Sequence, residues 1–310
     1  MPNGTFPKPT FGSADFQNWF ETVRTDDAAG NYVNFRLRAR EAARWQNLRP
    51  TIVQYLEWAH ADARRIFHDS LGITLDPRGG RPPVEYPGSL PLKTRKGYFG
   101  EVFCGILADA GQVHAEHEWT VPIFLFRLHN QAEEYLMRLI TGEPAAGTIV
   151  GRTGSDNIAV SLNGDGTVKA ILGEEAKCYE TYNTTLAREA LTDLGAQAAV
   201  PVSLGQLKRL LAEIDPEGFE ATILDLERII KRARQSTVPR HDVLVLIFEN
   251  PAIQNYNSPR ISVAEKNANY AGGRPLQVVE VHLPGAGALI EELYAGLYAN
   301  IPNTPDAAAH

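Results

Sequence analysis

The sequence predicts an α/β fold in which a mixed β-sheet is flanked by helices. Several segments carry apolar residues three and four positions apart, which is the spacing of amphipathic helices. Other, shorter segments are β-branched and apolar, as buried strands are. The order of these segments is helix, strands, hairpin, helices, strand, strand and helix, which favours a mixed sheet covered by helices.

The first ninety residues are expected to form an N-terminal arm and a helical extension. Residues 1–30 are rich in Pro, Gly, Asn and Asp and predict an irregular surface arm. Residues 34–68 have apolar side chains at helical spacing and predict two amphipathic helices, with Pro50 tolerated in a first turn. Residues 76–91 contain five prolines and three glycines, so a long loop or boundary is expected before a domain over 91–310.

From residue 91 onward, helical and strand patterns follow one another. The expected helices are residues 95–110, the second part of 120–140, 184–194, 203–214, 219–235 and 288–297. The expected strands are residues 148–150, 158–162, 168–172, 243–248 and 276–283. Asn163-Gly164-Asp165-Gly166 separates the second and third of these strands and predicts a hairpin turn.

Composition and charge exclude several classes of protein. The 310 residues are 44% hydrophobic and 22% charged, which is typical of a globular chain and not of a disordered one or a coiled coil. The net charge of −7 argues against binding to nucleic acid or membranes through bulk charge, so nucleic-acid contacts are expected from local basic patches. Two cysteines, no signal-peptide pattern and no membrane-spanning run predict a cytoplasmic protein with no membrane partner.

Charged residues around the predicted hairpin are the candidates for catalysis. Because strand side chains alternate, Glu175 and Lys177 are expected to share one face, with Glu174 on the other face as a structural residue. Asp156 begins the first hairpin strand and is expected opposite them. Two carboxylates beside an amine suit a divalent metal and an attacking water. The alternative is a turn aspartate beside an exposed cross-strand salt-bridge pattern.

These residues resemble the PD-(D/E)xK nuclease superfamily, in which an Asp on one strand and a Glu-x-Lys on the paired strand form the metal site. Gly154-Ser155-Asp156 stands where that family often has Pro-Asp, and Glu101 matches the glutamate that family members often add from the preceding helix. A narrower resemblance, over roughly residues 93–180, is to the nuclease subunit of the Hachiman antiphage defence system. It depends on four segments: Arg95-Lys96-Gly97, Phe99-Gly100-Glu101, Gly154-Ser155-Asp156 and Gly173-Glu174-Glu175-Ala176-Lys177.

The resemblance implies a restriction-endonuclease-like fold and DNA hydrolysis that depends on Mg²⁺ or Mn²⁺. Asp156 and Glu175 would ligate the metal, Lys177 would orient water or stabilise negative charge, and Glu101 would complete a second metal position. For Glu101, the alternative is a solvent-facing helical carboxylate. The resemblance also implies an antiphage effector controlled by a helicase-like partner.

Two rival functions are compatible with the same residues. One is a stand-alone restriction endonuclease that reads DNA sequence itself. The other is a non-catalytic interaction or sensing module that keeps the nuclease fold.

Three further motifs receive an interpretation. Lys93, Arg95 and Lys96 precede the helix of Glu101 and are expected to contact a DNA backbone. Residues 114–118, His-Ala-Glu-His-Glu, are dense in metal-ligand types but match no zincin spacing and show no third ligand, so a polar loop is favoured. Residues 151–155 lack the ending of a phosphate-binding loop and are interpreted as the turn that presents the aspartate.

Overall fold

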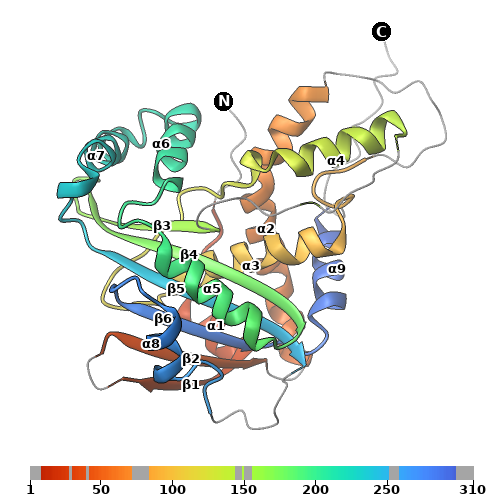
Figure 1. Cartoon of the computed structure of the whole chain (residues 1–310). Helices are drawn as coiled ribbons and strands as arrows, with labels where there is room; N and C mark the ends of the chain where they lie inside the picture. The colour runs from red at the N-terminus through yellow and green to blue at the C-terminus, as the bar shows by residue number, and fades with distance from the viewer. Residues whose placement is uncertain are drawn as a thin grey trace.

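A six-stranded mixed β-sheet forms the centre of the computed structural model (Figure 1). The structure describes residues 8–27, 30–39, 42–71, 84–143, 149, 156–250 and 258–297. The strands are β1 (Phe20–Asp26), β2 (Tyr32–Ala39), β3 (Asn157–Leu162), β4 (Val168–Thr181), β5 (Arg240–Asn250) and β6 (Leu276–His282). Their order across the sheet is β1-β2-β6-β5-β4-β3, parallel from β2 to β4 and antiparallel at both edges. The mixed α/β class predicted from the sequence is confirmed.

Helices cover both faces of this sheet (Figure 1). The helices are α1 (Ser13–Trp19), α2 (Ala42–Leu71), α3 (Leu92–Asp109), α4 (Asn130–Thr141), α5 (Thr184–Ala196), α6 (Ser203–Ile214), α7 (Glu220–Lys231), α8 (Val263–Asn269) and α9 (Ala286–Gly296), with 3-10 turns at Phe126–Leu128 and Ala233–Gln235. Helices α1, α2, α3 and α9 share the largest apolar core with one face, and α5 and α8 lie on the other. A third core joins α6 and α7 to β3 and β4. None of the described helices combines the length and apolar character needed to cross a lipid bilayer.

Strand β5 shows how the sequence builds the two faces. Its side chains are buried from Arg240 to Phe248, as expected for a parallel strand covered on both sides. Val243 and its alternate neighbours pack in the core with α3, whereas Leu244 and its alternate neighbours pack in the core with α5. The same alternation assigns a face to every residue registered beside β5 on β4.

The predicted hairpin is confirmed. β3 and β4 pair antiparallel around a turn in which Gly166 has a φ of +80°, and the Asp165 carboxylate accepts hydrogen bonds from Thr167. β4 continues to Thr181, well beyond the predicted end at Leu172, because its second half pairs with β5. Tertiary pairing therefore extends a strand that the local apolar pattern had ended.

The N-terminal predictions are wrong in two places. Residues 13–26 form α1 and β1 instead of an irregular arm, and residues 34–39 belong to β2 instead of a helix. The physical reason is pairing: β2 lies between β1 and β6, and the buried Asn34 donates a hydrogen bond to Glu280 of β6 at 2.8 Å. The two helices predicted up to His68 are one helix, α2, since buried Leu48, Ile52 and Tyr55 continue its apolar stripe past Pro50.

The remaining element predictions agree with the structure in part. Residues 120–125 contribute a single bridge, from Thr120 to Val160. The helix predicted over 219–235 ends at Lys231, before a short 3-10 turn. Most of the predicted strand at 148–150, the turn at 151–155 and the first part of the loop at 76–91 lie outside the described residues. The division near residue 90 remains a prediction, although one apolar core contains side chains from both sides of it.

Candidate active site

The candidate site is built on β4, where Glu175 and Lys177 share the α5 face of the sheet. Glu175 lies beside Leu244 in the register with β5, and Leu244 packs in the core with α5. Glu174 lies beside Val243 and therefore faces α3. The alternation expected from the sequence is confirmed, and Glu175 and Lys177 point to the same side.

Asp156 lies at the edge of β4, directly before β3. Its backbone N–H donates to the carbonyl of Glu174 at 3.0 Å, and its Oδ2 accepts a hydrogen bond from the N–H of Ala176 at 2.8 Å. Ala176 separates Glu175 from Lys177 in the chain. The side chain of Asp156 is therefore held beside both residues by the hairpin backbone.

Glu175 and Lys177 form a close ion pair in partly buried surroundings. Lys177 Nζ donates to Glu175 Oε1 at 2.5 Å, with the lysine side chain 36% exposed and the glutamate side chain 8% exposed. Burial raises the pKa of Glu175 to about 8; the negative charge of Asp156 adds to this, and Lys177 opposes it. Burial lowers the pKa of Lys177, but attraction to Glu175 and Asp156 outweighs burial and leaves it raised. Lys177 is thus charged at neutral pH.

Glu101 lies on α3, which packs tightly over β4. A Cβ added at Gly100 would lie 3.0 Å from the Cβ of Ala176, so the helix backbone is close to the strand. Glu101 is only 7% exposed, and the alternative that it is a solvent-facing carboxylate is wrong. Burial raises the pKa of the Cys104 thiol, which lies on the same helix. Four carboxylates raise this pKa further: those of Glu174, Asp156, Glu101 and Glu175. These charges act on the thiol from both faces of β4, since Glu175 faces α5 and Glu101 lies on α3.

The second buried carboxylate of β4, Glu174, has its own partners on the α3 face. It accepts a hydrogen bond from Asn157, and burial raises its pKa to about 8. Its Oε1 is buried and has no hydrogen-bond partner among the described residues. Lys8 offers it partial charge compensation. These contacts fit the structural role expected for Glu174.

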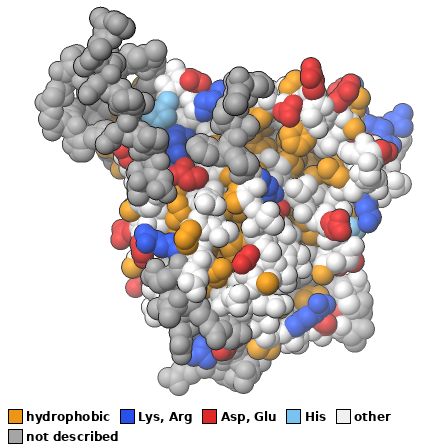
Figure 2. All heavy atoms as spheres, turned by 180° about the vertical axis from the view of Figure 1, so that it is seen from behind, with side chains coloured by type: hydrophobic (Ala, Val, Ile, Leu, Met, Phe, Trp, Pro, Cys, Tyr) orange, Lys and Arg blue, Asp and Glu red, His pale blue; other side chains and the backbone are white. Residues whose placement is uncertain are grey.

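The basic residues ahead of Glu101 differ in availability. Lys96 Nζ contacts Glu249 at 2.9 Å, and Arg95 lies 3.9 Å from Glu291, so both face a carboxylate. Lys93 is exposed at the start of α3. On the face seen in Figure 2, basic and acidic side chains are interspersed over the described residues. Of the three predicted DNA contacts, Lys93 has the most open position.

A different group of side chains has the tightest metal-ligand geometry in the described part of the chain. The ligand atoms of His114, Glu116 and His241 all lie within 4.8 Å of one another, and no other group of three or more His, Cys, Asp or Glu residues there does so. Asp156, Glu175 and Glu101 are not drawn together to this degree. Residues 114–118 alone offer no third ligand, but His241, at the start of β5, supplies one. No sequence spacing could reveal it, because only the pairing of the strands brings it there.

No protein-family model matches this chain, and no curated protein matches it. What the protein does is therefore inferred from the residues of its site and from their geometry.

Proposed function

We propose that the protein is a metal-dependent nuclease that hydrolyses DNA phosphodiester bonds with Asp156, Glu175 and Lys177. The contact between Asp156 Oδ2 and the N–H of Ala176 carries this proposal, because it brings a second carboxylate to the Glu-x-Lys pair. The mixed sheet flanked by helices, which is the fold class that the resemblance implies, supports it as well.

The charge balance of the site favours a divalent cation. Glu175 is buried beside the negative charge of Asp156, and one lysine compensates for only part of the two carboxylates, so the pKa of Glu175 stays raised. Carboxylate oxygens are the ligands that Mg²⁺ and Mn²⁺ accept most readily. Asp156 and Glu175 would hold the cation, and the cation would polarise the scissile phosphate and acidify a water.

Lys177 would act through its charge. Its raised pKa means that the ammonium keeps its proton at neutral pH, so it does not serve as a general base. Its partial exposure lets it face a phosphate from solvent while it remains paired with Glu175. It would stabilise the negative charge that develops on the phosphoryl oxygens or orient the attacking water. The resemblance implies a second metal position at Glu101, but Glu101 lies on α3, which covers the face of β4 opposite Glu175, so this proposal gives it no ligand role.

The wider biological assignment depends on the sequence resemblance. In this proposal the protein is an antiphage effector whose cutting is controlled by a helicase-like partner. The acidic net charge of −7 is consistent with delegated targeting, since the chain has little bulk attraction for DNA. Lys93 is the proposed contact to the DNA backbone.

Cleavage assays on matched variants test the proposal. Purified protein is incubated with supercoiled plasmid, linear DNA and RNA, with Mg²⁺, with Mn²⁺ or with EDTA. Asp156→Asn, Glu175→Gln and Lys177→Met are each expected to reduce DNA cleavage about 10²–10³-fold. Glu174→Gln is the matched control, because it changes the neighbouring carboxylate on the opposite face of β4 and is expected to keep activity. Equal cleavage by the wild type and the three site variants contradicts the proposal.

A further inference from the structure

A second cluster of metal-ligating side chains lies where β5 begins. His241 is the second residue of β5, and His114 and Glu116 belong to the loop after α3. Alternation puts His241 on the same face as Val243, which packs with α3, whereas Glu175 lies on the α5 face. This cluster is therefore separate from the candidate nuclease site, and it does not depend on the proposed function.

His114, Glu116 and His241 each direct one possible ligand atom toward the other two. Glu116 Oε1 lies 3.6 Å from His114 Nδ1 and 3.7 Å from His241 Nδ1. Four ligands about 2.0–2.1 Å from a zinc ion are about 3.3 Å apart, so these separations exceed a metal-bound geometry by a few tenths of an ångström. His241 is 7% exposed, and its Nδ1 is buried with no hydrogen-bond partner among the described residues. That orphaned nitrogen faces the carboxylate.

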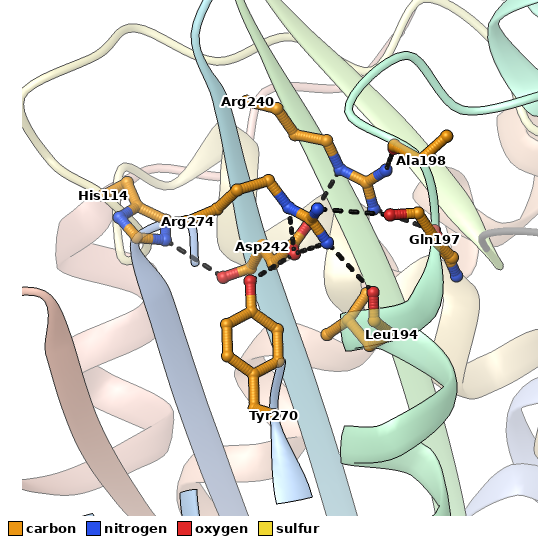
Figure 3. A network of polar contacts seen from close by, with 8 residues as sticks. All are labelled: His114, Leu194, Gln197, Ala198, Arg240, Asp242, Tyr270 and Arg274. Atoms are coloured by element: carbon orange, nitrogen blue, oxygen red, sulfur yellow. Dashed lines mark hydrogen bonds and ion pairs between the residues drawn. The ribbon is translucent and has the colours of Figure 1, made fainter. Parts of the chain in front are cut away.

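The tautomer of His114 leaves the lone pair of Nδ1 available to bind a metal ion. Its Nε2 lies 3.1 Å from the backbone carbonyl of Asp242, and a carbonyl only accepts, so the proton is on Nε2 and the lone pair on Nδ1. The Asp242 side chain is in turn held by Arg240, Arg274 and Tyr270, as Figure 3 shows. A ring nitrogen bonded to a fixed carbonyl is the usual support of a metal-binding histidine.

His117 supports His241 in the same way. The Nε2 atoms of the two rings are 3.2 Å apart, close enough for one N–H to donate to the other. When His241 Nε2 carries the proton, its Nδ1 lone pair faces Glu116 and His114. His117 therefore acts on the cluster through His241, as a positioning residue.

The loop that presents His114 is strained and fixed. His114 has a φ of 40°, and it is the only residue other than glycine with a positive φ in the described part of the chain. Its N–H donates to Gln277 of β6 at 2.9 Å, and its carbonyl accepts from the Trp119 indole at 3.1 Å. A strained residue held by long-range contacts is characteristic of functional positions.

We propose that His114 Nδ1, His241 Nδ1 and a Glu116 oxygen bind one Zn²⁺ ion, with solvent at the fourth position. Glu116 has 58% of its side chain exposed, which leaves the site open to water on one side. Two imidazoles and one carboxylate form a ligand set known for zinc. Mg²⁺ is disfavoured because it prefers oxygen ligands, and Ca²⁺ is disfavoured for the same reason. Bound zinc would link the loop after α3 to the first residues of β5.

Zinc titration of the full chain tests this site. Protein freed of metal with a chelator and dialysed is titrated with Zn²⁺ and, separately, with Mg²⁺ by calorimetry. One equivalent of Zn²⁺ is expected to bind, and Mg²⁺ is expected not to compete for it. His241→Gln and Glu116→Gln are each expected to weaken zinc binding about 100-fold. Wild-type protein that binds no zinc, or variants that bind it unchanged, overturns the proposal.

Two controls keep the result interpretable. His68→Gln changes an exposed histidine of α2 and is expected to bind zinc as the wild type does. Glu116→Gln decides the outcome if His241→Gln does not fold, because Glu116 is exposed and its replacement leaves the core intact. The zinc-bound protein is also expected to show altered imidazole ¹⁵N shifts at Nδ1, and not at Nε2, of His114 and His241. Binding through Nε2 overturns the geometry.

The positioning role of His117 has its own test. His117→Gln keeps an acceptor for His241 Nε2–H, whereas His117→Leu removes it. We expect His117→Leu to weaken zinc binding about 10-fold and His117→Gln to restore most of the affinity. Equal losses in both variants contradict a positioning role through the hydrogen bond.

Discussion

Asp156 accepts a hydrogen bond from the N–H of Ala176, at 2.8 Å, and so lies beside the two charged residues on either side of Ala176. The donor is a backbone group, so the hairpin itself holds Asp156 in this position, independently of the charge of Lys177. Removing the charge of Lys177 should therefore leave the two carboxylates where they are. The repulsion between Asp156 and Glu175 can then be measured through the pKa of Glu175 in the folded chain.

The stability of the protein should fall as the pH rises, in part because of Glu175. Its pKa is about 8 in the folded chain and near 4.5 when exposed, so its contribution is fully present below about pH 4.5 and is lost as the pH rises through 8. Compared with wild type, Glu175→Gln should lose about 1–3 kcal/mol less stability between pH 5 and pH 8. Urea unfolding across this range measures the difference. Parallel pH profiles in the two proteins would show that Glu175 titrates normally.

Magnesium should stabilise the folded chain at alkaline pH, where both carboxylates are charged. At ten times its dissociation constant, a ligand that binds only the folded state adds about 1.4 kcal/mol. Thermal melting at pH 8 should show this shift in the wild type and not in a double Asp156→Asn, Glu175→Gln variant. A shift of the same size in the double variant would place the magnesium elsewhere.

Two glycines of α3 should respond in opposite ways to a larger side chain. Gly100 faces Ala176, and a Cβ there would be 3.0 Å from the Cβ of Ala176, so Gly100→Val should cost about 1–3 kcal/mol through overpacking. Gly97 has nothing within 4 Å of its added Cβ, so Gly97→Ala should stabilise the helix by about 0.5–1 kcal/mol. Urea unfolding compares them. Tolerance of valine at 100 would mean that α3 moves away from β4 at little cost.

The buried ion network at the start of β5 should be costly to break. Asp242 is fully buried and contacts Arg240 and Arg274, so Asp242→Ala leaves two cations without their partner and should cost about 3–5 kcal/mol. Asp26→Ala breaks the exposed pair with Arg24 and should cost at most about 1 kcal/mol. Chemical denaturation of the two variants gives the comparison. Similar losses in both would mean that solvent reaches Asp242.

Local signals in the sequence were sufficient to predict part of the fold. The Asn163–Gly166 turn predicted the hairpin because its residues favour that backbone by themselves. Strand alternation likewise predicted that Glu175 and Lys177 share a face. Residues 34–39 were assigned to a helix because their strand conformation depends on β6, which local periodicity does not report.

The residues of the candidate sites also divide into those that the sequence could predict and those that it could not. The relation of Asp156 to Glu175 follows from one hairpin, so sequence reasoning reached it. The burial of Glu101 depends on how α3 packs over β4, and a helical pattern with apolar residues on most sides did not determine it. His241 joins His114 and Glu116 only after distant segments pair, and for that reason the sequence argued against a site there.

The placement of β2 between β1 and β6 also affects how the chain is made. Asn34 of β2 contacts Glu280 of β6 across 246 positions of sequence, so closing this pair carries a large loop entropy and a high contact order. During synthesis, the N-terminal hairpin has no neighbour on its inner edge until β6 has left the ribosome. The sheet is therefore completed only after His282 has been translated, and β2 keeps an open edge until then.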